Sequence, residues 1–151
     1  MIQLLSDNFV VDLLKIMQEM GINPKNTGIE ITESVFASDY TEINQIFQIL
    51  RDIGIHIAID DFGTGYSNFE NILKLNVDYI KIDGYLIQGI TENPRHHIVV
   101  ETIVNFAHKI GAKTIAEFVS CEAIYNVVKE LGIDYSQGYY SGRPQEIASS
   151  I

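Results

Sequence analysis

Apolar residues recur along this chain with two different spacings, one typical of helices and one typical of strands. Four long segments place apolar residues three and four positions apart, over about residues 9–17, 43–53, 98–110 and 124–131. Each is followed by a glycine, at position 21, 54, 111 or 132, and glycine is the residue that most often ends a helix. Short runs rich in isoleucine lie between these segments, and their length and composition predict strands.

The expected strands alternate strictly with the expected helices. They cover residues 28–32 (GIEIT), 55–61 (IHIAIDD), 77–83 (VDYIKID), 113–118 (KTIAEF) and 134–137 (DYSQ). This order is typical of the α/β class, with a parallel sheet built from right-handed crossovers. A closed eight-stranded barrel usually needs about 250 residues, so the count alone favours an open five-stranded sheet.

Polar residues lie within or at the end of every expected strand. They are Glu30 and Glu33, Asp60 and Asp61, Lys81 and Asp83, Glu117, and Gln137. In parallel sheets and barrels the carboxyl ends of the strands meet on one face, where catalytic residues are usually found. We therefore expect one pocket rather than scattered surface charge.

Two features of this set, an acidic pair and a lysine, are more informative than the others. Asp60 and Asp61 are adjacent acids after an apolar strand, and a cation would relieve their mutual repulsion. Lys81 lies between two isoleucines, so its ammonium is expected to be buried and to need a carboxylate partner. Taken singly, Glu30 or Glu117 is more often a solvated or ion-paired residue.

Composition limits the classes of partner. Asp and Glu outnumber Lys and Arg by 20 to 10, and the net charge of −10 argues against a polymeric nucleic acid. A small anionic substrate is compatible with this charge if metal ions supply positive charge. No apolar run reaches the roughly 18 residues of a membrane span, so we expect no membrane contact from this segment. The chain lacks a leader pattern and has a single cysteine, Cys121, which together indicate a cytoplasmic protein.

The expected pocket has several carboxylates, one amide and one lysine. These ligand types suit Mg²⁺ or Mn²⁺ better than zinc. Their usual chemistry is hydrolysis of a phosphate ester, in which two ions activate water and stabilise the attacking and leaving oxygens. Tyr139 and Tyr140 follow the last strand and could either stack on a base or line the rim of the pocket.

Five motifs in order, IEITES, IDDFGTGYSN, DYIKIDG, IAEFVS and SQGYY with GRP, resemble those of the EAL-domain family of bacterial cyclic di-GMP phosphodiesterases. The resemblance covers nearly the whole chain. It implies a modified TIM barrel that binds cyclic di-GMP and hydrolyses it to linear pGpG with two Mg²⁺ or Mn²⁺ ions, in second-messenger signalling.

The resemblance also implies a role for each site residue. Glu30 and Asp60 look like metal ligands, and Asp61 looks like the ligand that bridges or flanks both ions. Lys81 resembles the lysine that orients the attacking water, with Asp83 beside it, and Glu117 resembles the glutamate that acts on that water. Glu33 looks like the residue that steadies the DDFGTGYS loop, and Gln137 looks like a glutamine that lines the site.

The sequence departs from the family pattern in two places. Ser120 stands where the family fragment AEGVE has a second glutamate, and the Glu-Ala-Leu signature and the asparagine-bearing strand that follows it are absent. The resemblance therefore replaces the open sheet with a partial TIM-like (β/α) barrel of about five of eight strands, in which residues 1–151 are the carboxyl-terminal portion of one EAL domain.

Three expectations follow from this interpretation. The chain alone should be inactive or nearly so, because metal ligands are missing. The alternative is a non-catalytic cyclic di-GMP receptor or a protein-interaction module. In either case the unpaired strand edges of an opened barrel predict self-association, for example as a homodimer.

Overall fold

A computed structural model of the chain describes residues 8–32, 40–63 and 69–144. Five parallel strands form one sheet in the order β1-β2-β3-β4-β5. They are β1 (Gly28–Thr32), β2 (His56–Phe62), β3 (Tyr79–Ile82), β4 (Lys113–Ala116) and β5 (Tyr135–Ser136). All five strands predicted from the sequence are present. The last three are shorter than expected, and Asp83, Glu117 and Gln137 lie just beyond their carboxyl ends.

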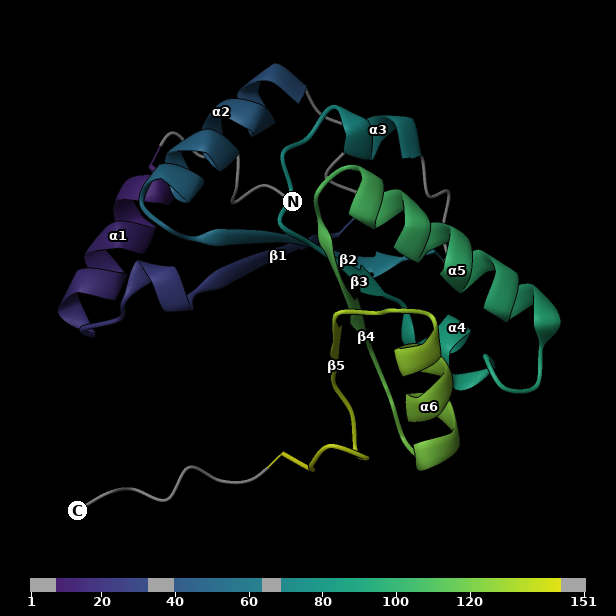
Figure 1. Ribbon diagram of the computed structural model, residues 1–151. Helices are drawn as coiled ribbons and strands as arrows, with labels where there is room; N and C mark the ends of the chain where they lie inside the picture. The colour runs from purple at the N-terminus through teal and green to yellow at the C-terminus, as the bar shows by residue number, and fades with distance from the viewer. Residues whose placement is uncertain (1–7, 33–39, 64–68, 145–151) are drawn as a thin grey trace, which may run out of the picture.

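Helices connect the strands and lie along one side of the sheet (Figure 1). They are α1 (Phe9–Glu19), the 3₁₀ helix η1 (Pro24–Asn26), α2 (Tyr40–Asp52), α3 (Phe69–Leu73), α4 (Gly84–Gln88), α5 (Pro94–Lys109) and α6 (Glu122–Glu130). The start of α5 follows from local chemistry, because Pro94 occupies the first turn and the Asn93 side chain accepts a hydrogen bond from the Arg95 backbone N at 3.0 Å.

The strand order identifies the kind of α/β fold. Doubly wound sheets reverse direction at a switch point, so their spatial order differs from their sequence order. Here each strand pairs with the next one along the chain, as in a (β/α) barrel. The predicted fold, part of a TIM-like barrel with five strands, is thus confirmed.

Each strand has one face toward the helices and one face away from them. The alternation is clearest in β2 and β3, where Ile57, Ile59, Ile80 and Ile82 are fully buried. These isoleucines belong to the main apolar core, together with Phe47 of α2 and other helical residues. Lys81, between Ile80 and Ile82, points to the opposite face and contacts Asp60 of β2 and Glu117 just after β4, so this face carries polar residues.

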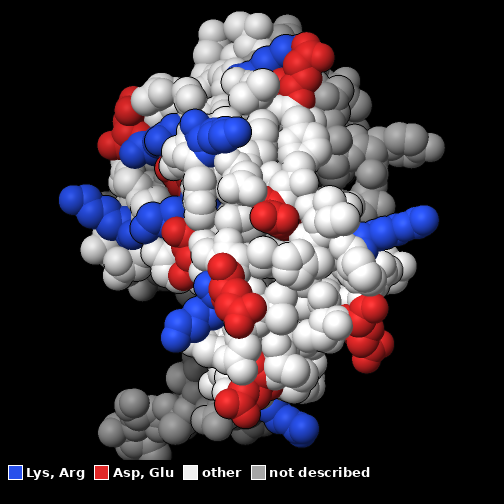
Figure 2. Space-filling model, turned by 45° about the vertical axis from the view of Figure 1, so that its right-hand side comes forward, with Lys and Arg blue, Asp and Glu red and all other residues white. Residues whose placement is uncertain are grey.

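On the face shown in Figure 2, acidic and basic side chains are interspersed, and neither kind forms a continuous patch. The surplus of acids is thus not concentrated on this face. Within the described part of the chain, no helix combines the length and the apolar character needed to cross a bilayer.

Candidate functional site

Lys81 lies at the centre of a cluster of carboxylates contributed by three other strands or strand ends. Its Nζ lies 2.6 Å from Asp60 Oδ1, 2.9 Å from Glu30 Oε2 and 2.9 Å from Glu117 Oε1. The Lys81 side chain is only 6% exposed. A buried ammonium needs partners of this kind, so the structure brings together four of the residues predicted from the sequence.

A local irregularity in β2 places two adjacent acids at this cluster. Ile59 pairs with Ile80 and Phe62 pairs with Ile82, so the two residues between them on β2 face the single residue between them on β3. This is the arrangement of a β-bulge. Asp61 has a φ of 54°, in the left-handed region that non-glycine residues rarely adopt. The bulge explains how Asp60 and Asp61 can both lie near Lys81, although successive residues of a regular strand alternate between faces.

Three carboxylates form a group able to hold a cation. Asp60, Asp61 and Glu117 each offer an oxygen, and these oxygens all lie within 4.8 Å of one another. Glu30 contacts Lys81 but does not belong to this group. Carboxylate oxygens at such spacing suit a hard divalent cation, so the donor set fits Mg²⁺ or Mn²⁺.

Burial and neighbouring charges shift the pKa values of three groups in this cluster. Burial raises the pKa of Asp61, and the nearby charges of Asp60 and Asp83 raise it further. Burial also raises the pKa of Glu117, although Lys81 acts against this. Burial by itself would lower the pKa of Lys81, but its hydrogen bonds to three carboxylates more than offset this and raise it. Lys81 is therefore a permanent cation, and a further cation would stabilise the charged carboxylates.

Gln137 positions Glu117. Its Nε2 donates a hydrogen bond of 2.7 Å to Glu117 Oε1, the same oxygen that contacts Lys81. Glu117 is 6% exposed and follows directly after β4. Two donors on one oxygen hold the carboxylate in one orientation, so Gln137 reaches the site through Glu117.

Asp83 has a structural role that the sequence did not suggest. Its Oδ1 accepts a hydrogen bond of 2.7 Å from the Tyr85 backbone N and thereby caps α4. Its charge still acts on Asp61. Glu33 and residues 64–68 of the DDFGTGYS motif lie outside the described residues.

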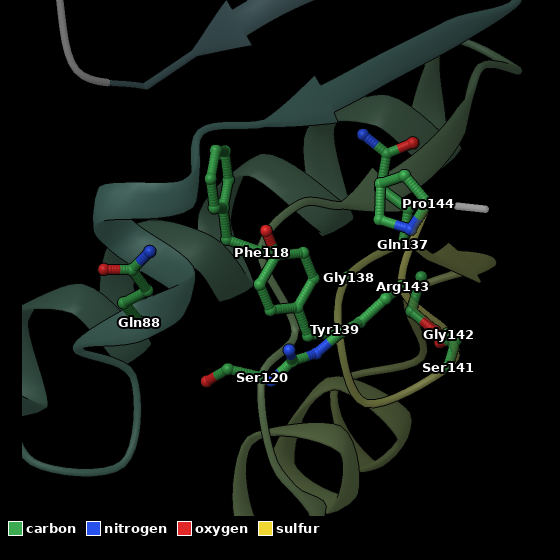
Figure 3. Close-up of a pocket in the computed structure, with 11 residues that line it drawn as sticks. Gln88, Phe118, Ser120, Gln137, Gly138, Tyr139, Ser141, Gly142, Arg143 and Pro144 are labelled. Carbon is green, nitrogen blue, oxygen red and sulfur yellow. The ribbon is translucent and has the colours of Figure 1, made fainter. Parts of the chain in front are cut away.

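A cavity of about 770 Å³ is lined mainly by residues that follow β4 and β5 (Figure 3). Gln88 of α4 also contributes to the lining. The lining includes Gln137, Phe118, Ser120, Tyr139 and Arg143. Gln137 lines the cavity and also donates to Glu117, so this residue links the cavity to the carboxylate cluster. Phe118 and Tyr139 are 60% and 65% exposed, and the Arg143 guanidinium lies 5.2 Å from the centre of the Tyr139 ring.

Sequence reasoning had missed Phe118 and Arg143. Phe118 follows Glu117 at a strand end, and Arg143 lies in the GRP fragment beyond Tyr139. A single aromatic or basic residue after a strand is too common to indicate a site by itself. The backbone provides a stronger signal, because Phe118 has a φ of 53° and, together with Asp61, is one of two described non-glycine residues with positive φ.

The chain resembles curated proteins over almost all of its length. It is 35% identical over 145 residues to the probable cyclic di-GMP phosphodiesterase PdeA of Escherichia coli. The aligned region covers 96% of this chain and 20% of that protein. It is 36% identical over 142 residues to the cyclic di-GMP phosphodiesterase PdeA of Borreliella burgdorferi. Here the aligned region covers 94% of this chain and 21% of that protein. The chain thus spans about a fifth of the length of these relatives.

Solved structures agree with this resemblance. The EAL domain of Mycobacterium smegmatis DcpA superimposes with a TM-score of 0.87 at 33% identity, covering 94% of this chain and 64% of that one. The PaMucR phosphodiesterase in complex with c-di-GMP superimposes with a TM-score of 0.86 at 29% identity. The superposition covers 95% of this chain and 58% of that one. The EAL domain model matches residues 2–144, and with the fold and the motifs at the strand ends this establishes that the chain belongs to the EAL domain family.

Proposed function

We propose that this chain contributes the site of a metal-dependent phosphodiesterase that hydrolyses cyclic di-GMP to linear pGpG. The observation that carries the proposal is the group formed by Asp60, Asp61 and Glu117 beside Lys81. Gln137 links this group to a cavity with two exposed aromatic rings. The relatives named as cyclic di-GMP phosphodiesterases support the same substrate.

Asp60, Asp61 and Glu117 would hold a divalent cation, Mg²⁺ or Mn²⁺, and Glu30 is a candidate ligand for a second. One solved neighbour, Klebsiella pneumoniae BlrP1, is described in a manganese and cyclic di-GMP complex at 27% identity. Such cations, when bound, supply Lewis-acid activation of the phosphodiester and of the attacking water. The chain needs them, because its own net charge of −10 would repel a dinucleotide with two phosphates.

The protein's own residues then handle the water and the substrate. Glu117 has a raised pKa and is held by Gln137, so it is suited to accept the proton of the attacking water. Lys81 keeps a permanent positive charge beside it and orients the water. Water attacks phosphorus, the bond from phosphorus to the 3′ oxygen breaks, and the product keeps a 5′ phosphate, as the name pGpG requires.

The cavity would bind the guanine bases. Phe118 and Tyr139 present ring faces on which a base can stack, and Arg143 adds a cation next to Tyr139. Asp83 supports this region by capping α4, and Glu33 is proposed to steady the DDFGTGYS loop.

We further propose that residues 1–151 form the portion of one EAL domain that carries these five strands, and that they act in the cytoplasm. By themselves they should hydrolyse cyclic di-GMP poorly, because three close carboxylates suffice for one cation whereas a two-ion site needs more ligands. The open edges of the sheet favour self-association of the chain.

One observation favours a second function. Ser120 lines the cavity at the position where the family fragment has glutamate, and a neutral hydroxyl supplies neither the negative charge nor the basicity of a carboxylate. This favours a receptor that binds cyclic di-GMP without hydrolysing it.

Calorimetry with cyclic di-GMP, with and without Mn²⁺, tests both functions. For the phosphodiesterase site we expect binding that depends on Mn²⁺, and we expect Asp61→Asn to weaken it by roughly 10- to 100-fold. Asp12→Asn, an exposed acid on α1, should leave it unchanged. Binding that is independent of Mn²⁺ would support the receptor, and no binding in either condition would contradict both.

A further inference from the structure

Lys81 and the candidate cation site use the same carboxylates. The ammonium contacts Asp60 and Glu117, two of the three residues whose oxygens lie within 4.8 Å of one another. Among the described residues the cluster contains four carboxylates, from Glu30, Asp60, Asp61 and Glu117, and one ammonium. Lys81 therefore supplies only part of the positive charge that the cluster needs.

The geometry allows Lys81 and a divalent cation to be bound together. Lys81 contacts Oδ1 of Asp60 and Oε1 of Glu117, which is one oxygen of each carboxylate. The second oxygen of Asp60 would then be available to the cation beside Asp61, and the second oxygen of Glu117 to the cation or to the attacking water. Asp61, on the bulge, lies beside these two carboxylates but forms no ion pair with Lys81 among the described contacts. Burial raises the pKa of Asp61, and the neighbouring carboxylates raise it further.

Lys81 also links its own strand to three others, one of which, β1, does not pair with β3. Glu30 lies on β1, Asp60 on β2, Lys81 on β3, and Glu117 directly after β4, so a single side chain connects four consecutive strands of the sheet. A lysine that only orients water would need contact with one or two of these groups. Three short contacts at 6% exposure indicate a role in holding the ligand-bearing strands together.

We propose that Lys81 is a built-in counter-cation that holds the metal ligands in place before the divalent cation binds. Lys81 acts as a positioning residue. Because the ammonium and the cation neutralise the same carboxylates, each can partly take over the stabilising effect of the other. This inference rests on the cation site proposed above. It follows that stabilisation by the cation should increase when the lysine is removed, because the cation then neutralises carboxylates that nothing else balances.

The test is the melting temperature of the chain, measured by circular dichroism in EDTA and in saturating Mn²⁺ at matched ionic strength. Removing one partner of a buried ion pair is strongly destabilising, so Lys81→Met should melt roughly 10 °C below wild type in EDTA. Mn²⁺ should raise the melting temperature of Lys81→Met at least twice as far as that of wild type. Lys81→Arg keeps the charge, so Mn²⁺ should raise its melting temperature as far as that of wild type. We call this rise in melting temperature the Mn²⁺ increment.

The matched control is Lys113→Met. Lys113 is also a lysine on a strand of the same sheet, but its Nζ contacts the hydroxyl of Tyr135 at 3.0 Å instead of the carboxylates. Its Mn²⁺ increment should equal that of wild type.

The possible results separate this inference from the proposed function. An equal Mn²⁺ increment in wild type and Lys81→Met would overturn the role of Lys81 and leave the cation site standing. No increment in either protein would overturn the cation site and this inference together. If Lys81→Met stays unfolded even in saturating Mn²⁺, the cation cannot replace the lysine and the inference is wrong.

Discussion

Phe118 has an exposed aromatic ring on a backbone that such residues seldom adopt. Its φ is 53°, and its side chain is packed so closely over Gly84 that a Cβ on that glycine would collide with the ring. A left-handed conformation costs a bulky residue roughly 1–2 kcal/mol. Strain of this kind persists where the surrounding structure imposes it, and it is found most often at functional sites.

Replacing Phe118 should weaken binding of cyclic di-GMP more than it affects the fold. Stacking of a base on an aromatic side chain contributes roughly 1–3 kcal/mol, so Phe118→Ala should raise the dissociation constant about 5- to 150-fold. Calorimetry in Mn²⁺ measures this. Phe118→Leu keeps the apolar bulk without a ring face and should lose nearly as much affinity. Full affinity in Phe118→Leu would show that bulk, not stacking, matters.

At the scale of the elements, Asp134 joins α5, β4 and the start of β5. Its Oδ2 accepts hydrogen bonds from the backbone N and the Oγ1 of Thr114, at 2.8 and 2.9 Å, and contacts His108 Nε2 at 2.9 Å. Burial raises the pKa of Asp134, but these hydrogen bonds and His108 outweigh that effect and lower it below 3.8. The charged form is therefore the form that stabilises the fold.

The lowered pKa determines the direction of the pH dependence. A carboxyl whose pKa is lower in the folded state adds stability above its unfolded pKa and loses it as the pH falls through the folded pKa. Hydrogen bonds to a charged group contribute about 1.5–3 kcal/mol, so Asp134→Asn should lower the free energy of unfolding by about that amount at pH 7. The difference from wild type, measured by urea denaturation, should shrink below pH 3.8.

The exposed Glu101 on α5 provides the control. Glu101→Gln should change the free energy of unfolding by less than about 0.5 kcal/mol at either pH. A constant difference between Asp134→Asn and wild type across the pH range would contradict the electrostatic explanation.

The turn after β5 depends on Gly138. Its φ is 152°, and a Cβ there would collide with the backbone of Val119. The chain needs this close approach because Val119 N donates to Gln137 O and Tyr140 N donates to Val119 O, both at 3.0 Å. These two bonds fix the segment that carries Gln137 and the tyrosines of the cavity.

Gly138→Ala should therefore destabilise the protein and move Gln137 away from Glu117. We expect a loss of about 1–3 kcal/mol in the free energy of unfolding, together with weaker binding of cyclic di-GMP. Gly142→Ala is the matched control, since a Cβ there meets nothing within 4 Å. Equal stability of the two variants would contradict the packing argument.

At the scale of the whole molecule, the described sheet has two edges. β1 and β5 each pair with one neighbour only, and an edge strand exposes backbone donors and acceptors to other chains. β1 is the longer edge, with five residues from Gly28 to Thr32. Pairing of copies through β1 would satisfy these groups.

We therefore expect light scattering at tens of micromolar to give a mass above the 17.0 kDa of one chain. A charge on an edge strand discourages pairing, so Thr32→Lys should shift the protein toward the monomer. Thr102→Lys, on the exposed side of α5, adds the same charge away from the edge and should not. A monodisperse monomer for the unmodified chain would show that the edges stay unpaired.

The sequence by itself determined the elements and the chemical content of the site. Alternating periods of apolar residues predicted every strand, and the polar residues at the strand ends predicted a common site at Asp60, Lys81 and Glu117, because these patterns depend on local spacing and on the geometry of parallel sheets. The motifs indicated the family, which the comparisons confirmed.

Only the tertiary structure decided how these residues are arranged. Strand periodicity predicts that Asp60 and Asp61 face opposite sides, and only the bulge opposite Lys81 accounts for both lying at the site. Whether Asp83 caps a helix, and whether Phe118 faces solvent or core, depends on segments distant in sequence. Local patterns cannot report such contacts, because they form only when the strands are brought into register.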